Sequence, residues 1–166
     1  MPTASTSGST KRSKSHTGAK TSASASKTAD AIKLLKEDHR EVKTWFKQYE
    51  KLEKKAEKEK LAQNICAALT VHAKIEEEIF YPALRKNIDD EELLDEAEVE
   101  HASAKQLIAE ILSMSPQDHL FDAKVKVLGE YVMHHVQEEE QEIFPEARKS
   151  EVDLDDLGVM LSERKA

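Results

Sequence analysis

The chain has 166 residues, which is the size of one ordinary domain. Charged residues make up 35% of it, aromatic residues 5%, and the formal net charge is −8, which argues against a large β-sandwich or an aromatic-rich nucleic-acid platform. The chain has only four glycines and four prolines, and this scarcity favours long helices over many tight turns. A single cysteine, Cys66, excludes an intramolecular disulfide and the usual cysteine-based zinc sites.

The first 28 residues differ in composition from the rest of the chain. Serine and threonine make up half of this segment, and it contains no acidic residue and no Leu, Ile, Val or Phe. Its five basic residues are Lys11, Arg12, Lys14, Lys20 and Lys27. The remaining residues therefore carry a net charge of −13, against −8 for the whole chain. Because the segment has almost no apolar surface to bury, we predict a disordered tail over residues 1–28 and a folded domain over 29–166.

The tail lacks the apolar stretch of a secretory signal and the apolar face of a mitochondrial transit peptide. No apolar run elsewhere approaches the length of a membrane span. We therefore expect a cytoplasmic protein without a membrane span. For the tail itself, weak contact with nucleic acid or an anionic surface is an alternative to a simple solvated segment.

After the tail, apolar residues recur at steps of three and four, which predicts amphipathic helices. The four stripes are Ile32-Leu35-His39-Val42-Phe46, Leu61-Ile65-Leu69-His72-Glu76-Ile79, Leu94-Ala97-His101-Ala104-Ile108 and Val125-Leu128-Val132-His135-Glu139-Ile143. Short connections make neighbouring helices antiparallel, so we predict an all-α, up-down-up-down four-helix bundle. A last apolar pattern over residues 154–161 predicts a short C-terminal helix that closes one end of the bundle.

Three breaks separate the four predicted helices. A change of phase places the first break near residues 54–57. Asp89 or Asp90 is suited to cap the third helix. Ser115 followed by Pro116, with Asp118 three positions after the serine, predicts the start of the fourth.

Histidine and glutamate interrupt the apolar stripes in a repeated pattern. His72 and Glu76, and likewise His135 and Glu139, are four residues apart and therefore share one face of a helix. The second pair follows the first by 63 residues, which indicates an internal repeat. The first and third helices add His39 and His101, each preceded by an acidic residue. The repeat predicts that four histidines and two glutamates converge in the core.

A lone histidine on such a stripe is usually a satisfied core residue, and a bundle without metal is the competing interpretation. Unpaired buried carboxylates, however, cost several kcal/mol each, and a bound cation removes that cost. A ligand set without thiolate suits iron, manganese or zinc, and bundles are known to hold two-metal carboxylate sites. Two histidines per ion, two bridging glutamates and a solvent-derived oxo or hydroxo bridge would leave an open position on each octahedral ion.

These residues resemble the motif of the hemerythrin-like, or HHE cation-binding, family. The matching positions are His39, His72, Glu76, His101, His135 and Glu139, with the aromatic–proline pairs Tyr81-Pro82 and Phe144-Pro145. The resemblance covers about residues 30–150 and implies a non-haem centre of two iron ions (Fe²⁺/Fe³⁺) in a four-helix bundle. Family members variously carry or sense dioxygen, handle nitric oxide, decompose peroxide, store iron or help to repair iron–sulfur centres.

Two departures from the family narrow these functions. Lys105 stands where the oxygen carriers have a fifth histidine, which argues against reversible oxygen carriage. Glu140 lies five residues after His135, which is the spacing between histidine and aspartate on the fourth helix of the oxygen carriers. The internal repeat, however, selects Glu139. The N-terminal region has no cysteine, unlike the iron-centre repair proteins. We therefore expect a di-iron protein that binds or reacts with O2, NO or peroxide, including peroxide breakdown; the alternative is a non-catalytic sensor, store or carrier.

Overall fold

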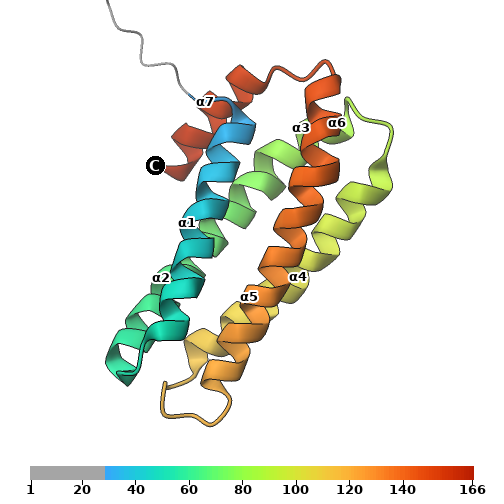
Figure 1. Cartoon of the computed structure of the whole chain (residues 1–166). Coiled ribbons are helices and arrows are strands. Elements are labelled where there is room, and N and C mark those ends of the chain that lie inside the picture. The colour runs from blue at the N-terminus through green and yellow to red at the C-terminus, as the bar shows by residue number, and fades with distance from the viewer. Residues whose placement is uncertain (1–28) are drawn as a thin grey trace, which may run out of the picture.

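The computed structural model of the chain describes residues 29–166, and the predicted tail over 1–28 lies outside them (Figure 1). Within the described part, every element is helical, which confirms the all-α prediction. None of these helices has an apolar stretch long enough to span a lipid bilayer.

Four long helical rods run up and down in turn and form the predicted bundle (Figure 1). The first rod is α1 (Ala31–Lys51), and the third is α4 (Glu91–Ser113). The second and fourth rods each contain one wider, π-helical turn. The second consists of α2 (Lys55–Ile75), the π turn η1 (Glu76–Phe80) and α3 (Tyr81–Arg85). The fourth consists of α5 (Phe121–Glu138), the π turn η2 (Glu139–Ile143) and α6 (Phe144–Lys149).

The helix boundaries agree in part with those predicted. Asp90 caps α4 by accepting a hydrogen bond from the Leu93 N–H, as expected. The first break covers residues 52–54, slightly earlier than the predicted 54–57, because Leu52 already adopts an extended backbone. The predicted start of the fourth helix at Ser115 is wrong. Asp118 does bond back to the Ser115 N–H, but this contact only closes a turn, and α5 begins at the buried Phe121.

The apolar core consists of two clusters stacked along the bundle. One surrounds Phe80 and Phe144, which are fully buried and pack edge to face with ring centroids 5.8 Å apart. The other fills the opposite end and includes Ile65, Leu128 and the buried Cys66. Burial raises the pKa of the Cys66 thiol to about 11, so this cysteine behaves as a small apolar side chain. Buried polar residues occupy the region between the clusters, and the candidate site lies there.

The predicted C-terminal helix is α7 (Leu154–Lys165), which packs across α1 at one end of the bundle (Figure 1). Its Leu157 and Leu161 are buried in the first cluster. Gly158 permits a close approach, because a Cβ atom at this position would lie 2.3 Å from the Ala29 carbonyl oxygen. The following turns bring Lys165 back to the side of the polar cluster.

Candidate metal centre

The structure brings all six predicted site residues together midway along the bundle. Every rod contributes at least one of these residues. His39 lies on α1 and His101 on α4, whereas the second rod contributes His72 and Glu76 and the fourth contributes His135 and Glu139. Both glutamates are completely buried, and the four histidine side chains are at most 12% exposed. Four chain segments far apart in sequence therefore converge on one buried point.

The four histidines form two pairs. The Nε2 atoms of His39 and His72 lie 3.1 Å apart, and those of His101 and His135 lie 3.2 Å apart. Potential ligand atoms gather in two overlapping groups, and within each group they lie within 4.8 Å of one another. The first group is His39, His72, Glu76 and Glu139, and the second is Glu76, His101 and His135.

Each glutamate reaches from one histidine pair to the other. Glu139 places Oε1 3.3 Å from Nε2 of His39 and Oε2 3.3 Å from Nε2 of His135. Glu76 contacts Nε2 of His72 through Oε1 and lies 3.7 Å from Nε2 of His101 through Oε2. The two oxygens of each carboxylate thus face different histidine pairs.

Within the described residues, the two buried acids face mainly histidine nitrogens and the Tyr81 hydroxyl, and most of their oxygens have no partner in hydrogen-bond geometry. Among the described residues, neither oxygen of Glu76 accepts a hydrogen bond, and nor does Oε1 of Glu139. Leaving such a group unpaired costs several kcal/mol, whereas coordination of a cation satisfies its oxygens. The donor set of imidazole nitrogens and carboxylate oxygens therefore fits iron or a similar transition-metal ion.

Carboxylates outside the cluster fix the orientation of the imidazoles. Three histidines use Nδ1, the nitrogen that faces away from the centre, to bond to an acidic side chain. The three bonds are His39 to Glu140, His72 to Asp38 and His135 to Glu100, each 3.0 Å long. An imidazole that donates its Nδ1–H outward presents the Nε2 lone pair inward, which is the tautomer that binds metal.

These outer carboxylates follow the internal repeat, and each serves a histidine of a neighbouring helix. Glu140 lies against the outer nitrogen of His39, whereas Glu139 lies among the potential ligand atoms of the cluster. Its repeat counterpart Glu77 lies 3.8 Å from Nδ1 of His101 and pairs with Lys105 at 2.6 Å. Lys105, which stands where the oxygen carriers have a fifth histidine, therefore pairs with the outer carboxylate of Glu77.

Without metal, protons bound to histidine offset the negative charge of the buried carboxylates. Burial alone would lower the pKa of His72, but the charge of Glu76 and the bond to Asp38 raise it to about 10. Burial opposes protonation of His135 too, yet Glu100 and Glu139 raise its pKa to about 11. A metal ion must displace these protons, so metal uptake at neutral pH releases protons.

The two π turns begin at Glu76 and Glu139. The N–H of Tyr81 bonds to the carbonyl of Glu76, and the N–H of Phe144 bonds to that of Glu139, five residues back instead of four. Pro82 and Pro145 follow directly, and a proline has no N–H for the regular helical bond. The widened turns bring Tyr81 and Phe144 against the histidines. π turns of this kind often occur at functional sites.

Tyr81 is a site residue that sequence reasoning did not identify. Its hydroxyl donates a hydrogen bond to Oε2 of Glu139 and lies 3.5 Å and 3.4 Å from Nε2 of His101 and His135. Its repeat counterpart Phe144 instead stacks on the ring of His39, with centroids 5.9 Å apart. The two halves of the centre therefore differ by one hydroxyl group. The replacement of tyrosine by phenylalanine between the two repeats is the sequence feature that could have indicated this role of Tyr81.

A small apolar cavity of about 50 Å³ adjoins the four histidines. Its lining includes Val42, Leu69, Ala104, Ile108 and Val132, which come from all four rods. The half-exposed Tyr131 also lines this space. Such a cavity has room for a molecule of a few atoms beside the metal-binding groups.

Comparison with known proteins agrees with this geometry. Residues 30–147 match the model of the hemerythrin HHE cation-binding domain. The chain belongs to this family. A crystal structure of an HHE domain-containing protein from Mycobacterium kansasii shares the fold, with a TM-score of 0.72 and 21% identity, over 82% of this chain and 85% of that one. A DNA nickase from Nostoc sp. is 30% identical over 120 residues, and the HHE domain chain spans about a third of that relative's length.

Lys165 of α7 supports one of the outer carboxylates of this HHE domain. Its Nζ pairs with Oδ1 of Asp38, whose other oxygen holds His72. We predict that Lys165→Met weakens iron binding about 10-fold, because Asp38 loses the partner that fixes it, and outer-layer changes typically cost 10–100-fold. Competition with a chelator measures this effect. The neighbouring Arg164→Met, which removes a contact with Glu78, is the control and should bind iron normally; equal affinities for both variants would contradict the prediction.

Proposed function

We propose that this HHE domain is a non-haem di-iron protein that binds a small diatomic ligand. His39 and His72 would hold one ion, His101 and His135 the other, and Glu76 and Glu139 would bridge them. The observation that carries the proposal is the span of each buried carboxylate between the two histidine pairs. Bound iron would supply redox chemistry and open coordination positions for O2, NO or peroxide.

The apolar cavity supports dioxygen or nitric oxide as the ligand. Val42, Leu69, Ile108 and Val132 offer no hydrogen bond to a polar molecule, and the accessible surface of the cavity is almost entirely apolar. A neutral diatomic molecule loses little solvation free energy on entering such a space, whereas peroxide would lose hydrogen bonds with water. Binding of O2 or NO is therefore favoured over peroxide breakdown.

Tyr81 supplies a hydrogen-bond donor on one side of the centre. Burial and the charges of Glu139 and Glu76 raise the pKa of its hydroxyl well above the usual 10, so the group keeps its proton at neutral pH. The hydroxyl holds Oε2 of Glu139 and so restrains the bridging carboxylate. The Phe144 side of the centre has no equivalent donor.

The function can be tested by loading the purified chain with Fe²⁺ under anaerobic conditions and adding O2, NO or peroxide separately. We expect charge-transfer absorption after O2 and a saturable spectral change with NO. Repeated consumption of peroxide by the loaded chain would identify an enzyme, while binding without turnover would indicate a sensor, store or carrier. A loaded chain that responds to none of the three molecules would refute the proposal.

A further inference from the structure

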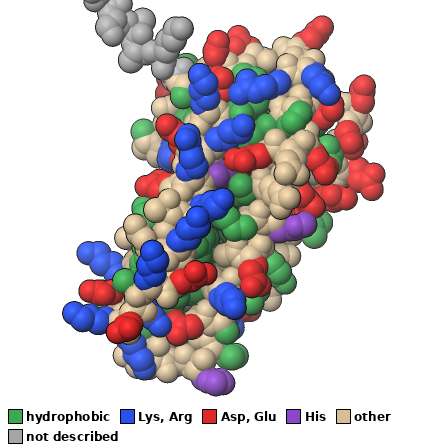
Figure 2. All heavy atoms as spheres, in the orientation of Figure 1, with side chains coloured by type: hydrophobic (Ala, Val, Ile, Leu, Met, Phe, Trp, Pro, Cys, Tyr) green, Lys and Arg blue, Asp and Glu red, His purple; other side chains and the backbone are tan. Residues whose placement is uncertain are grey.

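The outward face of α1 carries an uninterrupted row of positive charge. Its members are Lys33, Lys36, Arg40, Lys43, Lys47 and Lys51. At about 100° per residue, these positions fall within a sector of about 80°, and every α1 residue in that sector is basic. Figure 2 shows the corresponding run of blue side chains along the helix.

The positive charges of this α1 row are not neutralised within the described part of the chain. Many other cations there pair with acids, for example Lys58 with Asp122 and Arg85 with Asp95. None of the six α1 cations lies within ion-pairing distance of a carboxylate in residues 29–166. Five are exposed, and Lys36 is half-buried. The row therefore offers free cationic groups to an external partner.

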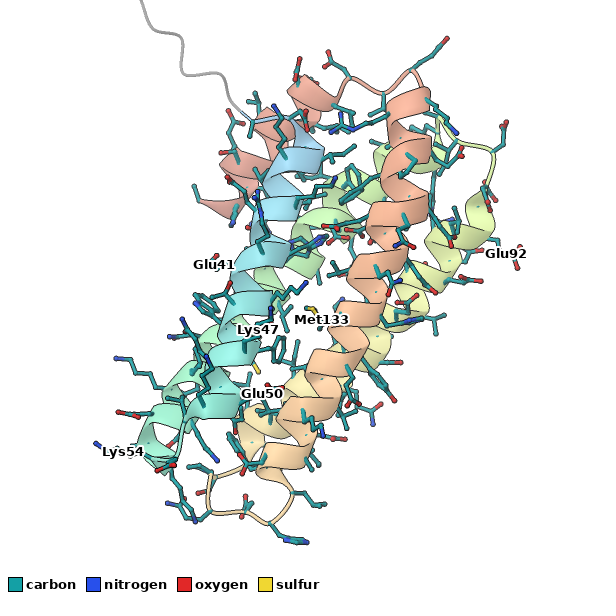
Figure 3. The ribbon with its side chains drawn as sticks, viewed as in Figure 1. Glu41, Lys47, Glu50, Lys54, Glu92 and Met133 are labelled. Carbon is teal, nitrogen blue, oxygen red and sulfur yellow. The ribbon has the colours of Figure 1, made fainter. Side chains whose placement is uncertain are left out.

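The surroundings of the α1 row restrict the shape of that partner. Glu37 and Glu41 flank it on one side of the helix and Glu50 on the other, and Figure 3 shows Glu41 and Lys47 leaving α1 on different sides. A broad anionic surface would meet these acids and be repelled, in a domain whose net charge is −13 over residues 29–166. A narrow anionic polymer can follow the row between them.

The dimensions of the α1 row suit a nucleic-acid strand. From Lys33 to Lys51 the row is about 27 Å long, and successive cations are about 4.5–6 Å apart along the axis. Phosphates along one strand of a DNA duplex recur about every 3.4 Å of its axis, so a row of this length can meet several phosphates. The sequence adds five more basic residues upstream of α1. Lysine and arginine contacts to phosphate provide affinity without reading base sequence.

We propose that the α1 row binds the phosphate backbone of a nucleic acid without sequence specificity. The inference rests on the charges of α1 and is independent of the di-iron proposal. Contacts to phosphates release counterions, so the affinity must fall steeply with salt, by a slope of about 0.9 per phosphate contacted on duplex DNA.

The test is fluorescence anisotropy of labelled random-sequence DNA, as a single strand and as a duplex, with the full chain. The NaCl concentration is varied between about 50 and 200 mM, where the loss of affinity by counterion release is large. The row variant replaces Lys36, Arg40, Lys43 and Lys47 with glutamine. The control variant replaces the exposed Lys60, Lys74, Lys86 and Lys149 with glutamine, so it loses the same amount of positive charge at other places on the surface. We expect the row variant to bind at least about 10-fold more weakly at low salt and its salt slope to fall by about three to four, while the control keeps the slope.

A second variant distinguishes binding by the α1 row from binding by the basic residues upstream of it. A variant with the five upstream basic residues changed to glutamine is expected to retain the row-dependent part of the affinity. Circular dichroism checks that all variants keep the helical fold. Equal DNA affinity of the row variant and the unmodified chain would overturn the proposal, as would row-dependent binding to phosphatidylserine vesicles without binding to DNA.

Discussion

Replacing Glu76 with alanine is expected to reduce iron from about two ions per chain to less than about 0.5, as the bridging geometry implies. Glu76 belongs to both groups of potential ligands, so its loss would remove a donor from each of the two proposed ions. His72→Ala, by contrast, removes a donor from one pair alone and should leave part of the iron bound. Iron content after desalting, measured by atomic emission, checks both expectations.

The matched control for this experiment is Glu78→Ala, a change in the same π turn. Glu78 is 43% exposed, and its carboxylate pairs with Arg164, so it does not face the histidines. This variant should retain the full iron content. If Glu76→Ala retained iron as well as the control does, the bridging role of Glu76 would be wrong.

Ala104→Phe is expected to slow the reaction of the iron-loaded chain with O2 or NO more than about 10-fold while iron content stays the same. Ala104 lines the cavity of about 50 Å³, and a phenyl ring there would occupy the space that the small ligand needs. Overpacking typically costs 1–3 kcal/mol of stability, so the melting temperature should also fall. Stopped-flow absorption of the loaded chain measures the rate.

Ala102→Phe on the same helix provides the control, because Ala102 is exposed and does not line the cavity. Its reaction rate should equal that of the unmodified chain. An unchanged rate in Ala104→Phe, with full iron content, would show that ligands reach the centre by another route.

The bundle and the convergence of the six residues were predictable because both depend on helical periodicity. His72 and Glu76 share a face whatever their neighbours are, and the repeated His135 and Glu139 double that signal. The start of α5 was not predictable from local signals. The contacts around Ser115 and Asp118 form as expected, yet they do not begin a helix, because apolar burial starts only at Phe121.

The outer layer of the centre depends on packing between helices, which sequence spacing does not reveal. Asp38 precedes His39 in the chain, but it holds His72 of the neighbouring rod and is itself held by Lys165, far along the sequence. The position of the Tyr81 hydroxyl likewise depends on the π turn at Glu76. Periodicity at regular helical spacing does not predict that turn, although the proline after it is consistent with the break.

The number of iron ions bound per chain tests the di-iron proposal most directly. Metal-stripped chain can be titrated anaerobically with Fe²⁺ in a calorimeter, with Glu76→Ala as the reference. We expect saturation at about two ions per chain, with release of protons from the histidines and loss of both binding events in the variant. Saturation at one ion or none, or the same titration curve for Glu76→Ala, would contradict that proposal.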